Sequence, residues 1–254
     1  MFRENMEIVF FGTANAFTTS ANNFHSNALI RSHGGHSLLI DCGADIRRSA
    51  HRLGYGEKDF EHVFITHAHC DHMGGLEWLG FTRYFSRMPR PKLYVNPILL
   101  SQIEQMLAPS MFCLDGKQAD LSTFFELKPT EAAFSHLGTE FQLISVEHTY
   151  HHKQANPSHG LFFHSPGHRV FYTGDCRLNV ELMMAKYEEA TLIFQDCETT
   201  PLPSGVHAHY DQLLALPAAI KNKMYLYHYH EPLKLDAEAA GFLGFVRPGQ
   251  VIQL

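Results

Sequence analysis

The sequence predicts an α/β sandwich of two mixed β-sheets flanked by helices. Short apolar runs of strand type alternate with segments of helical spacing along the whole chain. Glycine-containing turns join several of these runs in the manner of hairpins. No linker, repeat, low-complexity tract or charge block divides the 254 residues, so we expect residues 1–254 to form a single domain.

The first third of the chain supplies strands and one short helix. Gly34-Gly35 separates two apolar runs and predicts a hairpin turn, and Gly54 predicts the end of a helix. We expect strands at residues 7–11, 28–30, 37–40 and 62–65 and a helix at 45–54.

Only the first half of the middle third has patterns that predict secondary structure. Apolar residues at helical spacing predict a helix over 76–87, with Trp78 packing in the core, and residues 92–95 read as a strand. Asn96-Pro97 has the form of an N-cap followed by proline at the first helical position, which predicts a helix through Met106 or Leu107. Residues 108–140 show no firm period, and a lid, a dimer contact and irregular core all remain open there.

The last third returns to alternating elements. The run Ser165-Pro166-Gly167-His168 separates two apolar segments and predicts a second hairpin. We expect strands at residues 141–147, 160–164, 169–173, 190–195 and 224–227, a final turn and strand at 249–254, and helices at 179–187 and 211–221.

Composition limits the classes of function. The hydrophobic content of 45% is enough for a sizeable core. A net charge of −6 and a pI near 6.3 argue against general affinity for nucleic acid or for an acidic membrane. Nineteen histidines, many of them clustered, favour metal or phosphate chemistry.

Cysteine use and the N-terminal residues indicate the compartment. The five cysteines are odd in number and contain no CxxC, so neither a disulfide framework nor a zinc ribbon is predicted. Residues 1–7 are partly acidic and lack an apolar stretch, which argues against a signal peptide. No run approaches the roughly 18 apolar residues of a membrane span. We therefore expect a soluble, cytoplasmic protein with no membrane partner.

The most informative stretch lies directly after the apolar run 62–65. Four metal-capable side chains occur there within six positions, followed by Gly74-Gly75. They are His67, His69, Asp71 and His72. Imidazoles and a carboxylate without thiolate partners suit a cation such as Zn²⁺ that keeps open positions for chemistry.

This HxHxDH motif after an apolar strand resembles the signature of the metallo-β-lactamase fold. The resemblance implies a four-layer αββα sandwich and two divalent metal ions per chain, with zinc foremost and manganese, iron or cobalt as alternatives. Further ligands must then come from later strand ends. Three residues stand at such places: His148, Asp175 and His228.

The family pattern implies how these ligands divide. One metal would be held by three histidines, which are His67, His69 and His148. The other would be held by Asp71, His72 and His228, with Asp175 bridging the two, since one carboxylate can span cations about 3.5–4 Å apart. Cys70 and Cys176 lie beside these residues, and we interpret both as small buried fillers.

Among the two-metal branches, residues 192–212 distinguish phosphodiesterases from thioesterases of the glyoxalase II kind. They resemble the tRNA 3′-processing endonuclease (tRNase Z) branch, placing His207 where that branch keeps a catalytic histidine and Asp196 where it keeps an orienting acid. The sequence departs from the branch in having Asp196 for the usual glutamate and His209 for the usual threonine. A histidine held by a carboxylate can protonate an alkoxide that leaves phosphorus.

The substrate is expected to be small. A tRNA-cutting enzyme needs a basic surface, and this branch normally adds an arm rich in Gly, Pro and Lys, which we do not find. The leading hypothesis is a phosphodiesterase that hydrolyses a cyclic nucleotide by attack of a metal-held hydroxide, with Asp71 among the catalytic residues. Two alternatives remain, a tRNase Z-type endoribonuclease and a non-catalytic metal-dependent sensor.

Loop residues complete the expected pocket. His209 is predicted to assist His207, and polar residues in other loops are predicted to line the substrate. These further residues are His25, Asn27, His151 and His152. Extended nucleic-acid binding is not expected, and a homodimer is compatible with the aromatic-rich stretch 108–134.

Overall fold

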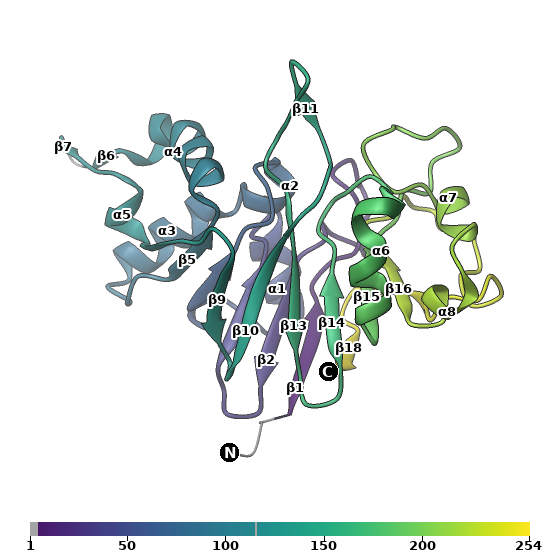
Figure 1. Ribbon diagram of the computed structural model, residues 1–254. Helices are drawn as coiled ribbons and strands as arrows, with labels where there is room; N and C mark the ends of the chain where they lie inside the picture. The colour runs from purple at the N-terminus through teal and green to yellow at the C-terminus, as the bar shows by residue number, and fades with distance from the viewer. Residues whose placement is uncertain (1–4, 115) are drawn as a thin grey trace.

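Two seven-stranded sheets pack face to face in a computed structural model that describes residues 5–114 and 116–254 (Figure 1). The prediction about a signal peptide concerns residues 1–7, of which 1–4 lie outside the described residues. The expected sandwich of two mixed sheets flanked by helices is confirmed.

The first sheet comes mainly from the N-terminal half, and its order is β18-β1-β2-β3-β4-β5-β8. Strands β3, β4, β5 and β8 run parallel, whereas β18, β1, β2 and β3 are antiparallel neighbours. The strands are β1 (Met6–Phe10), β2 (Ala28–Ser32), β3 (Ser37–Ile40), β4 (His62–Phe64), β5 (Lys92–Val95), β8 (Glu126–Pro129) and β18 (Val251–Gln253).

The second sheet has the order β17-β16-β15-β14-β13-β10-β9, with β14 to β17 parallel and the remaining neighbours antiparallel. The predicted second hairpin is present, because β13 and β14 pair through His164 opposite Arg169. The strands are β9 (Ala133–His136), β10 (Thr139–Ser145), β13 (His159–His164), β14 (Arg169–Tyr172), β15 (Leu192–Asp196), β16 (Met224–Tyr227) and β17 (Gly244–Phe245).

Helices cover the outer faces of both sheets. One apolar cluster fills the space between the two sheets. Each sheet also packs against its own helices through one further cluster. On the first sheet lie α1 (Ile46–Arg52), the 3₁₀ turn η1 (Glu57–Asp59), α2 (Cys70–Met73), α3 (Leu76–Phe85), α4 (Pro97–Met111) and α5 (Leu121–Phe124). On the second lie α6 (Val180–Glu189), α7 (Tyr210–Leu214) and α8 (Ala218–Lys221).

Two sequence predictions about helices are wrong in extent. The expected helix over 211–221 is split into α7 and α8, because Pro217 lacks a backbone N–H and sits at the N-cap of the second piece. Helix α4 begins as predicted, with the Asn96 side chain accepting from the backbone N–H of Ile98 at 3.0 Å. It continues past the predicted end to Met111, with Leu107 and Met111 buried.

Two short hairpins extend from the sandwich. One consists of β6 (Cys113–Leu114) and β7 (Lys117–Gln118). The other consists of β11 (Tyr150–His151) and β12 (Gln154–Ala155), turns at His152 and Lys153 with positive φ at both, and projects beyond the rest of the surface (Figure 1). We call this second one the β11–β12 hairpin.

Among the described residues, no helix combines the length and the hydrophobicity that crossing a bilayer requires.

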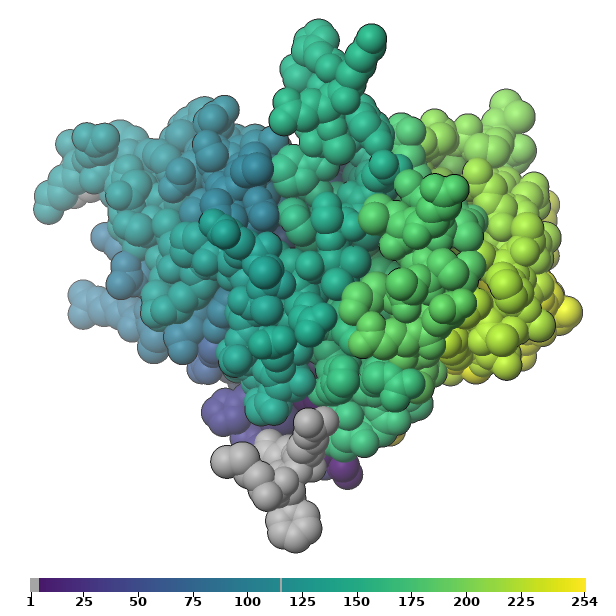
Figure 2. Space-filling view, in the orientation of Figure 1, coloured from purple at the N-terminus to yellow at the C-terminus, as the bar shows by residue number. Residues whose placement is uncertain are grey.

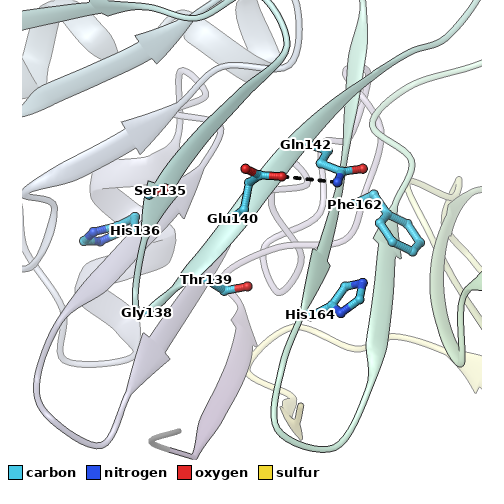
Figure 3. Close-up of a pocket in the computed structure, with 8 residues that line it drawn as sticks. All are labelled: Ser135, His136, Gly138, Thr139, Glu140, Gln142, Phe162 and His164. Atoms are coloured by element: carbon cyan, nitrogen blue, oxygen red, sulfur yellow. Dashed lines mark hydrogen bonds between the residues drawn. The ribbon is translucent and has the colours of Figure 1, made fainter. Parts of the chain in front are cut away.

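A depression of about 580 Å³ lies on the outer face of β9, β10 and β13, where Gln142 donates a hydrogen bond to Glu140 at 3.3 Å (Figure 3). Among the described residues that line it, none is a predicted site residue. The candidate site therefore lies elsewhere, at the edge of the sandwich where the parallel strands end.

Candidate metal centre

The predicted metal ligands meet at one edge of the sandwich. Parallel strands place their carboxyl ends at a common edge, so loops that follow them lie side by side. The HxHxDH loop follows β4, and the other ligands follow strands of the second sheet: His148 after β10, Asp175 after β14 and His228 after β16. Residues from both sheets thus reach the same place.

The first group consists of His67, His69 and His148. The Nδ1 atom of His69 lies 3.0 Å from Nε2 of His67 and 3.2 Å from Nε2 of His148. Two nitrogens that each bind a tetrahedral zinc at about 2.0–2.1 Å are about 3.3 Å apart. The three imidazoles are therefore spaced as neighbouring ligands of one cation.

The second group consists of Asp71, His72, Asp175 and His228. Oδ2 of Asp175 lies 3.1 Å from Nε2 of His72 and 3.2 Å from Nε2 of His228. The same oxygen is 3.8 Å from Nε2 of His67, which belongs to the first group. Asp175 therefore lies between the two groups, as a bridging ligand must.

The chemistry of this cluster fits divalent cations. Buried polar atoms without a hydrogen-bond partner in the described residues include Nε2 of His72 and Oδ1 of Asp175. Buried polar atoms are normally paired, and buried carboxylates need compensating positive charge. The ligand atoms of each group lie within 4.8 Å of one another. Divalent cations would satisfy both the unpaired atoms and the charge.

Three of the predicted ligand histidines are oriented through their other ring nitrogen. Nδ1 of His72 lies 2.7 Å from Oδ2 of Asp41, and Nδ1 of His148 lies 2.8 Å from the carbonyl oxygen of Val206. Nδ1 of His67 lies 3.0 Å from the hydroxyl of Thr66. Partners of this kind fix the tautomer and the ring direction of a ligand histidine, leaving Nε2 free for the metal.

Asp41 is a functional residue that the sequence analysis missed. It is fully buried after β3, its φ of 65° is rare outside glycine, and it accepts from both the backbone N–H (2.8 Å) and the hydroxyl of Thr66. The signal in the sequence was the strand-end Asp41-Cys42-Gly43, the same position that identified the other ligands. Gly43 belongs to this arrangement, because a Cβ there would lie 2.0 Å from the carbonyl oxygen of Asp71.

The two groups differ in charge. Burial lowers the pKa of His148 to about 4 and also lowers that of His67, so these rings are neutral and carry free lone pairs. In the second group burial opposes protonation, but carboxylates, Asp175 foremost, raise the pKa of His72 and bring that of His228 to about 10. The second group thus combines carboxylates with imidazoles that they hold protonated, and the first consists of neutral nitrogen ligands.

His207 and Asp196 lie beside the second group, and with Asp175 and His228 they form a third set whose ligand-type atoms lie within 4.8 Å of one another. Nδ1 of His207 is 2.8 Å from Oδ2 of Asp196, and the other oxygen of Asp196 is 3.4 Å from Nδ1 of His228. Asp196 is fully buried, and its Oδ2 also accepts from the backbone N–H of Cys176 at 2.8 Å. Burial works against protonation of His207, but the Asp196 carboxylate raises its pKa.

Two of the residues predicted to bind substrate have their polar atoms engaged in the fold. The His209 ring lies 2.8 Å from the carbonyl oxygen of Thr200 and accepts from the backbone N–H of Asp211, capping α7. The buried Asn27 side chain accepts from the backbone N–H of Gly43 at 2.7 Å and donates to the carbonyl oxygen of His25 at 2.9 Å. These contacts favour structural roles for both residues.

The remaining loop residues divide between the interior and the surface. His25 lies 3.5 Å from Asp45, whereas His151 and His152 are exposed on the β11–β12 hairpin. Cys176 is buried as predicted, but Cys70 is exposed, so its interpretation as a buried filler is wrong. Cys70 occupies the first position of α2, whereas the three residues that follow it in this helix are buried.

The surface around the centre is shaped by the β11–β12 hairpin. It rises as a narrow projection between the part of the surface formed by α4 and the part formed by the C-terminal third (Figure 2). It directly follows His148 in the chain, and Arg177 braces its base by donating to the carbonyl oxygen of His148 at 2.9 Å and lying over the ring of Tyr150.

Known proteins share this sequence and this architecture. Residues 6–252 match the family described as "Anti-Pycsar protein Apyc1". A protein of that name from Paenibacillus sp. (strain J14) is 31% identical over 248 residues, which cover 96% of this chain and 97% of the relative.

Two solved structures carry the same fold. The metallo-β-lactamase fold protein YhfI from Bacillus subtilis has a TM-score of 0.76 at 18% identity, covering 99% of this chain and 100% of its own. The short form of human tRNase Z has a TM-score of 0.69 at 16% identity, covering 97% and 98%. The metallo-β-lactamase fold expected from HxHxDH is therefore confirmed.

Proposed function

Because this chain belongs to the anti-Pycsar protein Apyc1 family, we propose that it hydrolyses one ester bond of a cyclic nucleotide at the centre described above. Its class, a metal-dependent hydrolase of the phosphodiesterase type, follows from the family. The observation that carries the proposal is the pairing of His207 with Asp196 beside two groups of metal ligands.

The residues that would hold metal are those of the two groups. His67, His69 and His148 would hold one divalent cation, Asp71, His72 and His228 a second, and Asp175 would contact both. Zinc suits ligands of this kind best. When bound, such cations supply an activated water and neutralise charge on the phosphoryl oxygens.

His207 would handle the proton of the leaving group. Asp196 holds the ring through Nδ1, so Nε2 is the atom available to the substrate. Water adds its oxygen to phosphorus, the bond from phosphorus to one ribose oxygen breaks, and Nε2 of His207 gives its proton to that oxygen. The product is a nucleoside monophosphate, and the proton lost by the water returns the histidine to its starting state.

Size and charge favour a small substrate. The cavity that adjoins the first group has a volume of about 270 Å³, just below the roughly 300–1,000 Å³ of typical small-molecule sites. The β11–β12 hairpin is too short to resemble the Gly-, Pro- and Lys-rich arm of a tRNA-processing enzyme. The net charge of −6 also gives no general attraction for RNA.

The test is a substrate panel offered to the metal-loaded protein. It contains 3′,5′-cyclic mononucleotides, cyclic dinucleotides, a precursor tRNA and bis(4-nitrophenyl) phosphate, with products resolved by chromatography. We expect a cyclic nucleotide to be converted to its linear phosphate while the precursor tRNA stays intact. Cleavage of the RNA alone would establish the endoribonuclease, and bound metal without turnover of any diester would establish a binding module.

A further inference from the structure

The chain between β15 and α7 carries two parts of the metal centre on neighbouring residues. The carbonyl oxygen of Val206 lies 2.8 Å from Nδ1 of His148, a predicted metal ligand. The next residue, His207, holds its ring 2.8 Å from the Asp196 carboxylate. We call residues 199–207 the 199–207 loop. The path of this loop therefore fixes the direction of a ligand histidine and the place of the proposed proton donor together.

Glu198 closes this loop through its backbone. Its N–H donates to the carbonyl oxygen of Ala208 at 2.9 Å, and its carbonyl oxygen accepts from the N–H of Tyr210 at 2.9 Å. These two bonds form an isolated β-bridge between Glu198 and His209. The His209 ring lies 2.8 Å from the carbonyl oxygen of Thr200, which ties the start of the loop to the same point. The two ends of the loop are thus fastened to each other.

The Glu198 side chain holds the middle of the loop. It is 4% exposed and accepts from the Thr200 hydroxyl at 2.7 Å and from the Ser204 hydroxyl at 2.9 Å. The backbone N–H of Ser204 donates to both carboxylate oxygens, at 3.1 and 2.9 Å. Residues 201–205 are exposed, so packing contributes little to their position. The loop therefore keeps its path mainly through these bonds to one buried carboxylate.

Glu198 is charged at neutral pH. Burial alone would raise its pKa, but hydrogen bonds from the backbone N–H of Ser204 and from the Thr200 and Ser204 hydroxyls outweigh burial and lower the pKa. Both oxygens are therefore acceptors, and hydrogen bonds to a charged acceptor are roughly twice as strong as neutral ones. A carboxylate bonded in this way is a firm anchor for an exposed loop.

We propose that Glu198 is a positioning residue that fixes the 199–207 loop, so that His207 faces the leaving oxygen and Val206 orients His148. The inference rests on the proposed hydrolysis of a cyclic nucleotide with His207 as the proton donor. Glu198 divides this task with Asp196, which contacts the His207 ring itself. The chemistry at phosphorus stays with the residues of the metal centre.

Two substrates with different leaving groups separate this role from general damage to the fold. The ribose oxygen of a cyclic nucleotide leaves as an alkoxide and needs a proton, whereas 4-nitrophenolate leaves bis(4-nitrophenyl) phosphate without one. The experiment measures kcat at saturating zinc for that diester and for the 3′,5′-cyclic mononucleotide that the parent turns over fastest. Glu198→Ala should lower kcat for the cyclic nucleotide about 10²-fold, as expected for a displaced catalytic group, with little change for the nitrophenyl diester.

A second variant keeps the test valid if alanine at the buried position 198 prevents folding. Ser204 is exposed, and Ser204→Ala removes one of the bonds to Glu198, so we expect a smaller loss with the same dependence on the leaving group. Glu198→Gln keeps an acceptor for Ser204 and should recover most of the turnover. The matched control is Glu188→Gln on the exposed face of α6, which should match the parent on both substrates.

Two further measurements identify the residues through which Glu198 acts. If its effect on turnover passes through His207, the double variant Glu198→Ala/His207→Ala should hydrolyse the cyclic nucleotide as slowly as His207→Ala alone. Multiplication of the two losses would contradict this. Displacement of Val206 should also weaken zinc binding about 10- to 100-fold, the usual cost of losing the partner that orients a ligand histidine, and competition with a zinc-binding dye measures it.

The outcomes distinguish the two proposals. If cyclic nucleotides are hydrolysed but Glu198→Ala and Ser204→Ala either match the parent or lower both substrates by the same factor, the positioning role is rejected and the proposed function stands. If the parent turns over bis(4-nitrophenyl) phosphate and none of the cyclic nucleotides, the proposed function is rejected. The zinc affinity of Glu198→Ala then decides the remaining role, because an affinity equal to that of the parent rejects the effect on His148.

Discussion

Two clusters of histidines lie at opposite ends of the same sandwich and have opposite properties. At the strand ends, the ligand histidines lie among buried carboxylates, with Asp175 3.1–3.2 Å from two of them. At the other end, the rings of His62 and His136 stack at 3.7 Å, one from each sheet, and among the described residues neither has a carboxylate within ion-pair distance.

A high local density of histidines is therefore not enough to make a metal site. His62 pairs with the hydroxyl of Tyr94 and His136 with the carbonyl oxygen of Ser37, so these rings satisfy their polar atoms within the fold. At the metal centre, polar atoms of His72 and Asp175 stay unpaired in the described residues. Unpaired polar atoms beside buried carboxylates distinguish the strand-end cluster as the candidate cation site.

The largest effect is expected from Asp71→Ala. Oδ2 of Asp71 lies 3.1 Å from Nε2 of His72 and 3.4 Å from Nε2 of His228, so the variant removes a ligand and a charge. We expect turnover to fall to background, and metal content measured by mass spectrometry to fall with it, while circular dichroism shows the fold kept. The matched control is His136→Asn, which should retain metal and activity. Equal metal loss in both variants would contradict the assignment of the metal to the strand ends.

The next effect is expected from His207→Ala. This ring contacts Asp196 and none of its nitrogens is needed for either ligand group as we assign them. Turnover should fall about 10²- to 10⁴-fold, the usual contribution of a general acid, with metal content unchanged. Activity equal to that of the parent would show that another group protonates the leaving oxygen.

A smaller effect is expected from Asp41→Asn, which keeps the volume of the side chain but removes the charge that orients His72. Loss of such an orienting partner typically costs 10- to 100-fold in metal affinity or activity. Competition with a zinc-binding dye measures the affinity. If affinity and activity both match the parent, Asp41 acts only on the fold, through its bonds to Thr66.

The smallest effect is expected on the pH dependence of folding stability, through His62. Burial, followed by the charges of His136, Lys92 and His36, lowers the pKa of His62 to about 4, and Glu126 opposes this only weakly. In the unfolded chain the ring binds a proton near pH 6.5, so the unfolded state binds more protons between these values. Stability is therefore full above about pH 6.5 and declines as pH falls toward 4.

For this partly exposed ring we expect a loss on the order of 1 kcal/mol after screening by solvent. Urea unfolding at pH 7 and pH 5 measures it, with His62→Gln as the reference that lacks the titrating group. The parent should lose more stability than the variant over this interval. The same loss in both proteins would assign the pH dependence to other groups.

The sequence predicted the centre better than its surroundings. His67, His69, Asp71 and His72 could be identified because four metal-capable side chains in six positions have no packing explanation. Asp41 was missed because its role depends on the parallel pairing of β3 and β4, which brings it beside Thr66 and His72. The strand-end position of Asp41 was visible in the sequence, but the pairing that brings it to Thr66 and His72 was not.

The elements of the fold were also predicted with unequal success. Strands with a continuous apolar run, such as β5, have the predicted bounds, because a strand that is buried on both faces needs consecutive apolar residues, which the local sequence shows. Residues 108–140 contain the end of α4, the short β6–β7 hairpin, α5, β8, β9 and the start of β10, and elements this short could not be resolved by periodicity. His209 and Asn27 looked exposed and reactive, but neighbouring backbone atoms occupy their side chains.

One carboxylate, Asp196, holds both His207 and His228. A change at position 196 would disturb proton delivery and cation retention at once, so the two tasks can be separated only at His207. An immobilised His207→Ala protein would then hold its natural ligand while consuming it about 10²- to 10⁴-fold more slowly. Such a reagent could recover that ligand from cell extracts and identify it by mass.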